Sequence, residues 1–270
     1  MNIFYHIIPF FSIGKLFEKS PLYIFLFAVI LRKNESGVIV VTEEKIKNDN
    51  DNIDTKSKKE YKKRMEELQG MISSVASRLS ESGRSMILVF EGLDASGKSG
   101  CIRRLTRELD MKQYRVVPVS KPTEEEYKHH YLRRFWLSLP EYKKITIFDR
   151  SWYGRVLVER IEGFATADEW MRAYREINEF ERMLTDDGTI LLKLWFEVSA
   201  DEQLKRFKKR MTDPEKMHKI TDEDWRNREK WDQYEVAIDE MIAKTSTTFA
   251  PWNIIEANDK LYARLKVINT

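Results

Sequence analysis

Hydrophobic positions along the chain follow two different spacings, which predict strands and helices in alternation. Short runs of consecutive apolar residues, typical of buried strands, occur at 86–90, 115–119, 144–148, 189–198 and 252–256. Apolar residues at helical spacing predict helices at 57–81, 124–137, 167–184, 200–211, 221–244 and 259–268. Strands that alternate with helices are typical of a parallel sheet covered by helices on both faces. The pattern therefore predicts an α/β fold.

The first 55 residues follow neither spacing. Two apolar runs, at 3–13 and 22–31, are each shorter than the ~20 residues that cross a bilayer. Two interpretations stay open: an anchor in contact with a membrane through residues 1–31, or a start codon assigned too far upstream. We therefore predict a divergent extension at 1–55 that need not belong to the folded domain at 56–270. At the other end, the lack of helix-ending residues favours a shortened C-terminus.

Charge and cysteine content narrow the class of protein. The formal net charge of the 270 residues is +3, which is too small to require a nucleic-acid partner, and we predict none. The single cysteine, Cys101, excludes an internal disulfide and favours a reducing compartment, so we expect a cytoplasmic protein. Cys101 lies on a predicted helix, where a packed small side chain is a better interpretation than a nucleophile.

Residues 92–99, GLDASGKS, match the phosphate-binding loop pattern GxxxxGK[ST] between a predicted strand and a predicted helix. Gly92 and Gly97 let the backbone curl so that several N–H groups point at one anion, and the helix start adds its positive end. Lys98 supplies a full charge to a phosphoryl oxygen. An ordinary glycine turn is the alternative, but the strand–loop–helix context favours binding of a phosphate chain.

Two carboxylates accompany this loop. Asp149 and Arg150 follow the strand at 144–148, at the sheet edge where ligands of open α/β sheets bind, and such an Asp holds Mg²⁺ in phosphate-loop enzymes. A helix N-cap is the other interpretation of Asp149. Asp94 lies inside the loop, where it would repel phosphates unless a metal cation lay between them; a local loop brace is its alternative. We predict a metal site at Asp94 and Asp149.

A basic segment at 203–211 follows the strand at 189–198 and precedes the helix breaker at Pro214. It is interpreted as a mobile lid whose arginines close over the transferring phosphoryl group, with a solvated helix face as the alternative. Together with the loop, it completes a row of predicted phosphate contacts: Gly92, Gly97, Lys98, Ser99, Arg103, Arg104, Arg206, Lys209 and Arg210.

Five stretches in this order resemble the polyphosphate kinase 2 family: FEGLDASGKSG, KHHYLRRFW, FDRSWYGRVLVERIEGF, ITDEDWRNREKWDQYE and APWNIIEANDK. The resemblance runs from about Tyr61 to the C-terminus and is nearest to the active domain of polyphosphate:AMP phosphotransferases. It implies a P-loop kinase fold, Mg²⁺, and phosphoryl transfer between inorganic polyphosphate and a nucleotide. The residues that match the family's catalytic positions are Asp94, Lys98, Asp149 and Arg150. The family commonly has Gly where this chain has Ser99.

The resemblance also implies a site for the acceptor nucleotide after the second strand, with contacts from Thr123, Arg133, Arg134 and Arg155. A solvated helix face is an equal interpretation of Arg133 and Arg134. The expected reaction is reversible, Mg²⁺-dependent, in-line transfer from polyphosphate to AMP, giving ADP, by a homo-oligomer. The alternatives are a polyphosphate-dependent nucleoside diphosphate kinase, an ATP-dependent nucleoside monophosphate kinase of the same fold, and an inactive polyphosphate-binding module.

Overall fold

The computed structural model describes three stretches of the chain: 31–33, 39–41 and 58–270. The chain divides into two compact units, 1–52 and 53–270. In the first unit, strands β1 (Leu31–Lys33) and β2 (Ile39–Val41) pair in antiparallel orientation. Apart from Leu31, the predicted membrane anchor lies outside the described residues. Across the three described stretches, no helix combines the length and the apolar character needed to cross a membrane.

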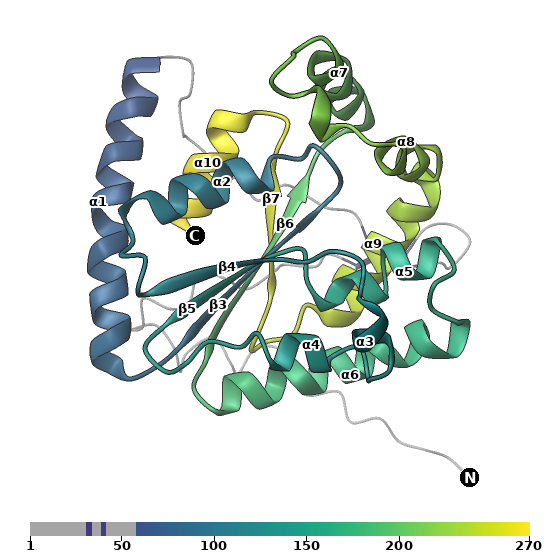
Figure 1. Cartoon of the computed structure of the whole chain (residues 1–270), viewed down its shortest axis with the longest axis horizontal. Helices are drawn as coiled ribbons and strands as arrows, with labels where there is room; N and C mark the ends of the chain where they lie inside the picture. Colours follow the sequence, from purple (N-terminus) through teal and green to yellow (C-terminus); the bar gives the residue numbers. More distant parts are fainter. Residues whose placement is uncertain (1–30, 34–38, 42–57) are drawn as a thin grey trace. The chain divides into compact units, whose positions relative to one another are not determined.

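A five-stranded parallel sheet forms the centre of the second unit (Figure 1). Its spatial order is β4 (Tyr114–Pro118), β5 (Ile145–Asp149), β3 (Met86–Gly92), β6 (Ile190–Glu197) and β7 (Trp252–Glu256). The central strand is β3, whose Leu88 lies between Ile147 of β5 and Leu192 of β6. All five carboxyl ends therefore share one edge of the sheet, the edge at which ligands of such sheets bind.

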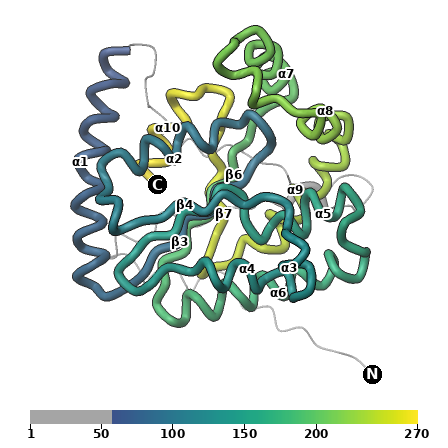
Figure 2. Tube along the Cα trace, in the orientation of Figure 1, coloured from purple at the N-terminus to yellow at the C-terminus, as the bar shows by residue number. Residues whose placement is uncertain are grey.

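Helices cover both faces of the sheet (Figures 1 and 2). One face carries α1 (Lys58–Ser82), α2 (Lys98–Leu105) and α10 (Lys260–Asn269). The other face carries α4 (Arg133–Trp136), α6 (Ala167–Asp186) and α9 (Trp231–Thr245). Further short helices connect these elements: η3 (Thr106–Glu108), α3 (Glu124–Tyr127), η4 (Trp152–Arg155), α5 (Val158–Ile161), α7 (Ala200–Met211), η5 (Met217–Lys219) and α8 (Asp222–Glu229).

Successive residues of β3 point to opposite faces of the sheet and join two separate hydrophobic cores. Leu88 and Phe90 pack in the core beneath α1, α2 and α10, whereas Ile87 and Val89 pack in the core beneath α4, α6 and α9. All four side chains are buried, which explains why this strand is apolar without interruption. The architecture confirms the predicted α/β fold with a parallel sheet flanked by helices.

The predicted single helix at 124–137 is wrong, because this segment forms two short helices, α3 and α4, joined by a turn. In the turn, the backbone N–H of Leu132 donates a hydrogen bond to the His130 imidazole Nδ1 at 3.3 Å, in place of a helical carbonyl. Leu132 and Phe135 are then buried in the core. Apolar spacing does not separate one helix from two whose apolar faces continue the same period.

The predicted helix at 221–244 is also interrupted. Helix α8 ends at Glu229 and α9 begins at Trp231, with Lys230 at the bend. Lys230 Nζ donates to the Glu162 carboxylate at 2.7 Å, which fixes the bend to the segment after α5. The bend leaves Tyr234 of α9 buried in the core while α8 turns toward the loop that follows β3.

Candidate active site

The loop between β3 and α2 is built on backbone angles that favour glycine. Gly92 has a φ of 143° and Gly97 a φ of 115°, and a Cβ at Gly92 would lie 2.6 Å from the carbonyl oxygen of Phe196. Ala95, with a φ of 59°, also lies in the left-handed region, at a cost of about 1–3 kcal/mol. The curled backbone leads into the first turn of α2, which is the anion-binding arrangement that the glycine spacing predicts.

Lys98, the first residue of α2, is folded into this loop. Its side chain is buried, and Nζ donates to the carbonyl oxygens of Gly92 at 2.6 Å and Leu93 at 3.1 Å. Burial, together with the charge of Arg150, lowers the pKa of the Lys98 ammonium, against the opposing charge of Asp94. The ammonium group thus lies within the curl of the loop, where a bound phosphoryl oxygen would replace its carbonyl partners.

Asp149 lies beside the start of the loop because it is in register with Phe90 of the neighbouring strand. Ser99 Oγ donates a hydrogen bond to Asp149 Oδ2 at 3.1 Å. A carboxylate and a hydroxyl are the hard oxygen ligands that Mg²⁺ prefers, usually completed by water and substrate phosphates. Ser99 and Asp149 therefore fit the predicted metal. Among the described residues, no group of three or more His, Cys, Asp or Glu side chains gathers as a metal centre.

Asp94, inside the loop, is held by side chains from two distant segments. Arg150 Nη2 donates to Asp94 Oδ1 at 2.6 Å, and Asn227 Nδ2 of α8 donates to Oδ2 at 2.9 Å. Burial raises the pKa of Asp94, but the charges of Arg150 and Lys98 outweigh it, so the pKa lies below its ordinary value. Each carboxylate oxygen of Asp94 therefore accepts one hydrogen bond from a distant segment, whereas its role as a metal ligand stays a prediction.

A second buried carboxylate, Glu91, stands directly before the loop and was not predicted as a site residue. Its Oε1 accepts a hydrogen bond from Ser151 Oγ at 2.8 Å. Burial raises the pKa of Glu91, opposed by this hydrogen bond and by the charge of Lys98. Arg150, which stands between Asp149 and Ser151 in the chain, has a φ of 66°. The signal in the sequence is a single acidic residue at the end of an otherwise apolar strand.

Side chains of α7 and α8 support the outer side of the loop. Gln203 Nε2 donates to the carbonyl oxygen of Asp94 at 3.0 Å. Arg228 Nη1 in turn donates to Gln203 Oε1 at 3.1 Å and to the Ala200 carbonyl oxygen at 2.7 Å. With Asn227, these residues connect the segment at 200–229 to the loop. Sequence reasoning missed all three, although Asn227 and Arg228 lie within one of the stretches that resemble the family.

Arg206 differs from its predicted role as a lid arginine. Its side chain is 4% exposed, and Nε binds the Glu202 carboxylate at 2.8 Å. The two terminal nitrogens donate to four backbone carbonyl oxygens, at 2.6–3.0 Å: those of Ala95, Ser96, Ala257 and Asn258. Because each nitrogen already has a protein acceptor, Arg206 ties the phosphate loop to the turn after β7 and does not extend over a phosphoryl group.

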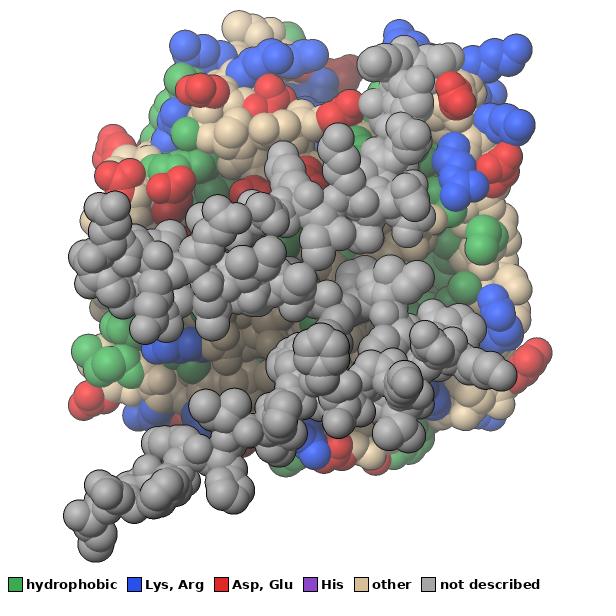
Figure 3. Space-filling view, turned by 180° about the vertical axis from the view of Figure 1, so that it is seen from behind, with side chains coloured by type: hydrophobic (Ala, Val, Ile, Leu, Met, Phe, Trp, Pro, Cys, Tyr) green, Lys and Arg blue, Asp and Glu red, His purple; other side chains and the backbone are tan. Residues whose placement is uncertain are grey.

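The other predicted phosphate contacts lie nearer the surface. Arg103 and Lys209 are exposed, and Arg210 Nη1 donates to the Lys219 carbonyl oxygen at 3.4 Å. Arg104 Nη1 donates to the Gly100 carbonyl oxygen at 2.8 Å within the first turns of α2. Figure 3 shows Lys and Arg side chains along the upper margin of the molecule, with acidic side chains near them.

The four residues expected at the acceptor site have different surroundings. Thr123 caps α3, where its Oγ1 accepts from the Glu126 N–H at 3.2 Å. Arg134 Nε pairs with the Glu126 carboxylate at 3.3 Å, and Arg133 is exposed. Arg155 pairs with a carboxylate of α5, that of Glu159, at 3.1 Å, yet its buried Nε has no hydrogen-bond partner in the described part of the chain. Arg133 is therefore open to a ligand, whereas the Arg155 donor without a partner is buried.

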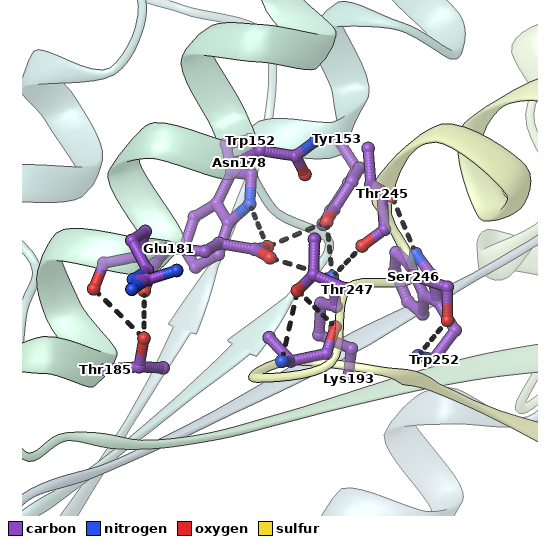
Figure 4. A network of polar contacts seen from close by, with 12 residues as sticks. Trp152, Tyr153, Asn178, Glu181, Thr185, Lys193, Thr245, Ser246, Thr247 and Trp252 are labelled. Atoms are coloured by element: carbon purple, nitrogen blue, oxygen red, sulfur yellow. Dashed lines mark hydrogen bonds and ion pairs between the residues drawn. The ribbon is translucent and has the colours of Figure 1, made fainter. Parts of the chain in front are cut away.

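A network of polar contacts joins Trp152 and Tyr153 to Glu181 and Lys193 (Figure 4). Lys193 Nζ of β6 binds Glu181 Oε2 of α6 at 2.8 Å, and both side chains are fully buried. Glu181 Oε1 also accepts from the Tyr153 hydroxyl at 2.7 Å and from the Trp152 indole N–H at 3.1 Å. Because Trp152 and Tyr153 follow Arg150 closely in the chain, this network anchors the end of the turn after β5.

Comparison with known proteins identifies the family of this site. Residues 55–270 match the family described as Polyphosphate kinase 2 (PPK2). The polyphosphate:AMP phosphotransferase of Pseudomonas aeruginosa is 55% identical over 186 residues, which are 69% of this chain and 38% of that protein. The GDP-polyphosphate phosphotransferase of the same organism is 40% identical over 209 residues, 77% of this chain and 58% of that protein.

A crystal structure described as a polyphosphate kinase 2 from Pseudomonas aeruginosa has the same fold, with a TM-score of 0.76 at 50% identity. The matched region makes up 79% of this chain and 47% of the chain in that crystal structure. The chain therefore spans less than half the length of that protein and of the polyphosphate:AMP phosphotransferase. The family match includes the phosphate loop, the end of β5 and helices α7 and α8. This chain belongs to the polyphosphate kinase 2 family.

Proposed function

We propose that the chain transfers the terminal phosphoryl group of inorganic polyphosphate to AMP, giving ADP, and that the reaction is reversible. The observation that carries this proposal is the convergence of Lys98, Ser99 and Asp149 at one point of the sheet edge. The relatives support the substrates, because the polyphosphate:AMP phosphotransferase is more similar to this chain than the GDP-polyphosphate phosphotransferase is. Transfer to a nucleoside diphosphate is therefore the second candidate.

In the proposed mechanism the protein positions the substrates and neutralises their phosphate charge, and it forms no covalent intermediate with them. The loop backbone and Lys98 hold donor phosphates. Asp149 and Ser99 would hold Mg²⁺, which neutralises phosphate charge when bound. Arg150, oriented by Asp94, presents its remaining donors to the charge that develops during transfer. Arg133 and Arg155 are the cations that we assign to the acceptor phosphate.

The choice of phosphoryl donor distinguishes the proposed enzyme from an ATP-dependent kinase. Polyphosphate is a chain of charges without a base, so it needs cations along its length, and the exposed Arg103 and Lys209 flank the loop on two sides. At equal phosphoryl and Mg²⁺ concentrations, polyphosphate should phosphorylate AMP at least about ten times faster than ATP does. Product analysis by anion-exchange chromatography measures both rates. The rate with polyphosphate should also fall as salt rises. Faster transfer from ATP would reject the proposed donor.

The segment before the family match should be dispensable for transfer. The match begins at residue 55, and the site residues lie between Glu91 and Arg228. Deletion of residues 1–54 should therefore leave kcat and KM within about twofold, a change below ~0.5 kcal/mol. Steady-state assays of both forms test this, with circular dichroism as the control for folding. A folded truncation without activity would show that the segment belongs to the enzyme.

Two further expectations remain proposals. We assign the enzyme to the cytoplasm, because a single cysteine forms no internal disulfide and suits a reducing compartment. Cys101 is buried, and burial raises the pKa of its thiol to about 12. This thiol packs in the core, as the sequence suggested, and does not act as a nucleophile. We also expect a homo-oligomer. Light scattering and sedimentation with membranes, compared between the full chain and the truncation, test the assembly and the proposed anchor.

A further inference from the structure

Glu91 is a buried carboxylate at the end of the central strand β3, and the proposed mechanism gives it no part. Its side chain is only 4% exposed, although it stands directly before the phosphate loop. Within the described part of the chain its carboxylate enters no ion pair, and the group that donates to it is the Ser151 hydroxyl, at 2.8 Å. Burial of a carboxylate is costly, so its hydrogen bond has to serve the fold or the site. What Ser151 holds in place therefore indicates the role of Glu91.

Ser151 directly follows a residue with a strained backbone. Arg150 has a φ of 66°, in the left-handed region that residues with a side chain rarely adopt. Its backbone N–H donates to the Phe90 carbonyl oxygen at 3.0 Å, and its Nη2 donates to Asp94 Oδ1 at 2.6 Å. A backbone of this kind persists only where the surrounding structure fixes it, and such residues concentrate at active sites. The turn after β5 is thus bent so that Arg150 reaches back to the phosphate loop.

The residues after Arg150 are fixed at two points. Ser151 Oγ accepts from the Tyr153 N–H at 3.3 Å, which caps the short helix η4, and it donates to Glu91. Further along, the Tyr153 hydroxyl donates to Glu181 in the core at 2.7 Å (Figure 4). Of these two contacts, the one with Glu91 lies nearer to Arg150 in the chain. It also connects the turn to β3, the strand that leads into the phosphate loop.

We infer that Glu91 is a positioning residue for phosphoryl transfer, which acts through Ser151 to hold the Arg150 guanidinium at the phosphate loop. The inference rests on the proposed function, in which Arg150 neutralises the charge that develops during transfer. Without Glu91 the turn keeps its contact with the core, but the strained backbone at Arg150 relaxes toward an ordinary conformation. The guanidinium then lies away from the transferring group, and a misplacement of ~1 Å costs up to about 100-fold in rate. Glu91 should therefore affect kcat and not the binding of the donor.

The test in the full chain pairs Glu91→Leu, which removes the acceptor at similar size, with Glu91→Gln, which retains an amide oxygen for Ser151. With AMP and long-chain polyphosphate, Glu91→Leu should lower kcat about 10- to 100-fold and change the KM for polyphosphate less than about twofold. Glu91→Gln should keep kcat within about threefold of the unsubstituted chain, because it still accepts the hydrogen bond. If Glu91→Leu does not fold, Ser151→Ala breaks the same hydrogen bond from the other side and should give the same loss of kcat.

A double-mutant cycle with Arg150→Ala separates positioning from a merely structural role. If Glu91 acts through Arg150, then Glu91→Leu should lower kcat less than about twofold once the Arg150 side chain is absent. A residue that only supports the fold would lower kcat by the same factor in both backgrounds, and that result would overturn the inference. Full activity of Glu91→Leu in the otherwise unsubstituted chain would overturn it as well.

The matched control is Ser85→Ala, at the opposite edge of the sheet. It breaks the hydrogen bond between the buried Ser85 and Thr189 hydroxyls, which lie 2.9 Å apart just before β3 and β6. This variant also loses a buried hydrogen bond next to β3, yet it should keep kcat within about twofold. An equal loss of kcat in the control would mean that any weakened contact of β3 slows transfer, and Glu91 would have no special role. Absence of transfer in the unsubstituted chain would reject the proposed function, whereas a defect confined to the Glu91 variants supports the positioning role.

Discussion

Replacement of Lys98 by Met should lower kcat for transfer about 10²- to 10³-fold and leave the fold intact. Losing one preorganised charge at a reacting phosphoryl group costs about 3–4 kcal/mol of transition-state stabilisation. Lys98 is buried within the loop, with its Nζ on two loop carbonyl oxygens, so Met keeps the volume and removes only the charge and these donors. Rates of ADP formation from AMP and long-chain polyphosphate measure the effect. The thermal midpoint should fall by only a few degrees.

Asp149→Asn is the companion substitution, and it tests metal binding separately from binding of the donor phosphates. Asn keeps the shape and can still accept from the Ser99 hydroxyl, so the contact at 3.1 Å survives. It removes the negative charge that a magnesium ligand supplies. We expect a similar loss of kcat together with a higher Mg²⁺ concentration at half-maximal rate. Lys112→Gln, on the exposed surface after η3, is the control that should keep full activity. Near-normal turnover of either folded site variant would refute the assignment.

The position of this site could be predicted from the sequence because local patterns fix it. The loop glycines dictate positive φ angles, and a buried strand that ends in Asp149 must place that carboxylate at the sheet edge. The parallel register then brings Asp149 beside Phe90, at the start of the loop. Nothing beyond strand order and strand ends is needed for this contact. The spacing of apolar residues likewise predicted the boundaries of α7 and β7 correctly.

The role of α7 could not be predicted, because a basic helix looks the same in sequence whichever face it buries. Gln203, Arg206 and Phe207 lie at helical spacing on one face, and that face packs against the loop. Two of the three are polar, so hydrophobic periodicity gives no reason to bury them. Arg206 is buried because backbone carbonyl oxygens of two loops surround its guanidinium. Contacts between distant loops of this kind depend on tertiary structure, which local patterns do not contain.

The buried pair Lys193–Glu181 is the other feature that local patterns miss. Lys193 interrupts an apolar strand and Glu181 lies on a long helix, and each alone is consistent with an exposed side chain. In the structure both side chains are fully buried and in direct contact, with Nζ and Oε2 2.8 Å apart. Burial raises the pKa of Glu181 and lowers that of Lys193, while their mutual attraction opposes both shifts. Neither charge is tolerable in this core without the other.

Lys193→Met should therefore lower the free energy of unfolding by about 3–5 kcal/mol, the usual cost of leaving one buried charge without its partner. The substitution leaves the buried Glu181 carboxyl group without its counter-charge and also removes the donor to the Thr245 carbonyl oxygen, now at 2.7 Å. Urea unfolding followed by tryptophan fluorescence measures the change. The control is Arg175→Met, which breaks an ion pair whose side chains are 76% and 65% exposed and should cost less than ~1 kcal/mol.

The double substitution Lys193→Met with Glu181→Gln distinguishes charge from packing. Gln is neutral, and its amide oxygen can still accept from the Tyr153 hydroxyl and the Trp152 indole that bind Glu181 Oε1. If the uncompensated charge dominates, the double variant should be more stable than Lys193→Met by about 1–3 kcal/mol, which is the size of coupling found between contacting groups. If packing dominates, the second substitution should add to the loss. A double variant that is less stable than Lys193→Met would therefore contradict the electrostatic account of this core.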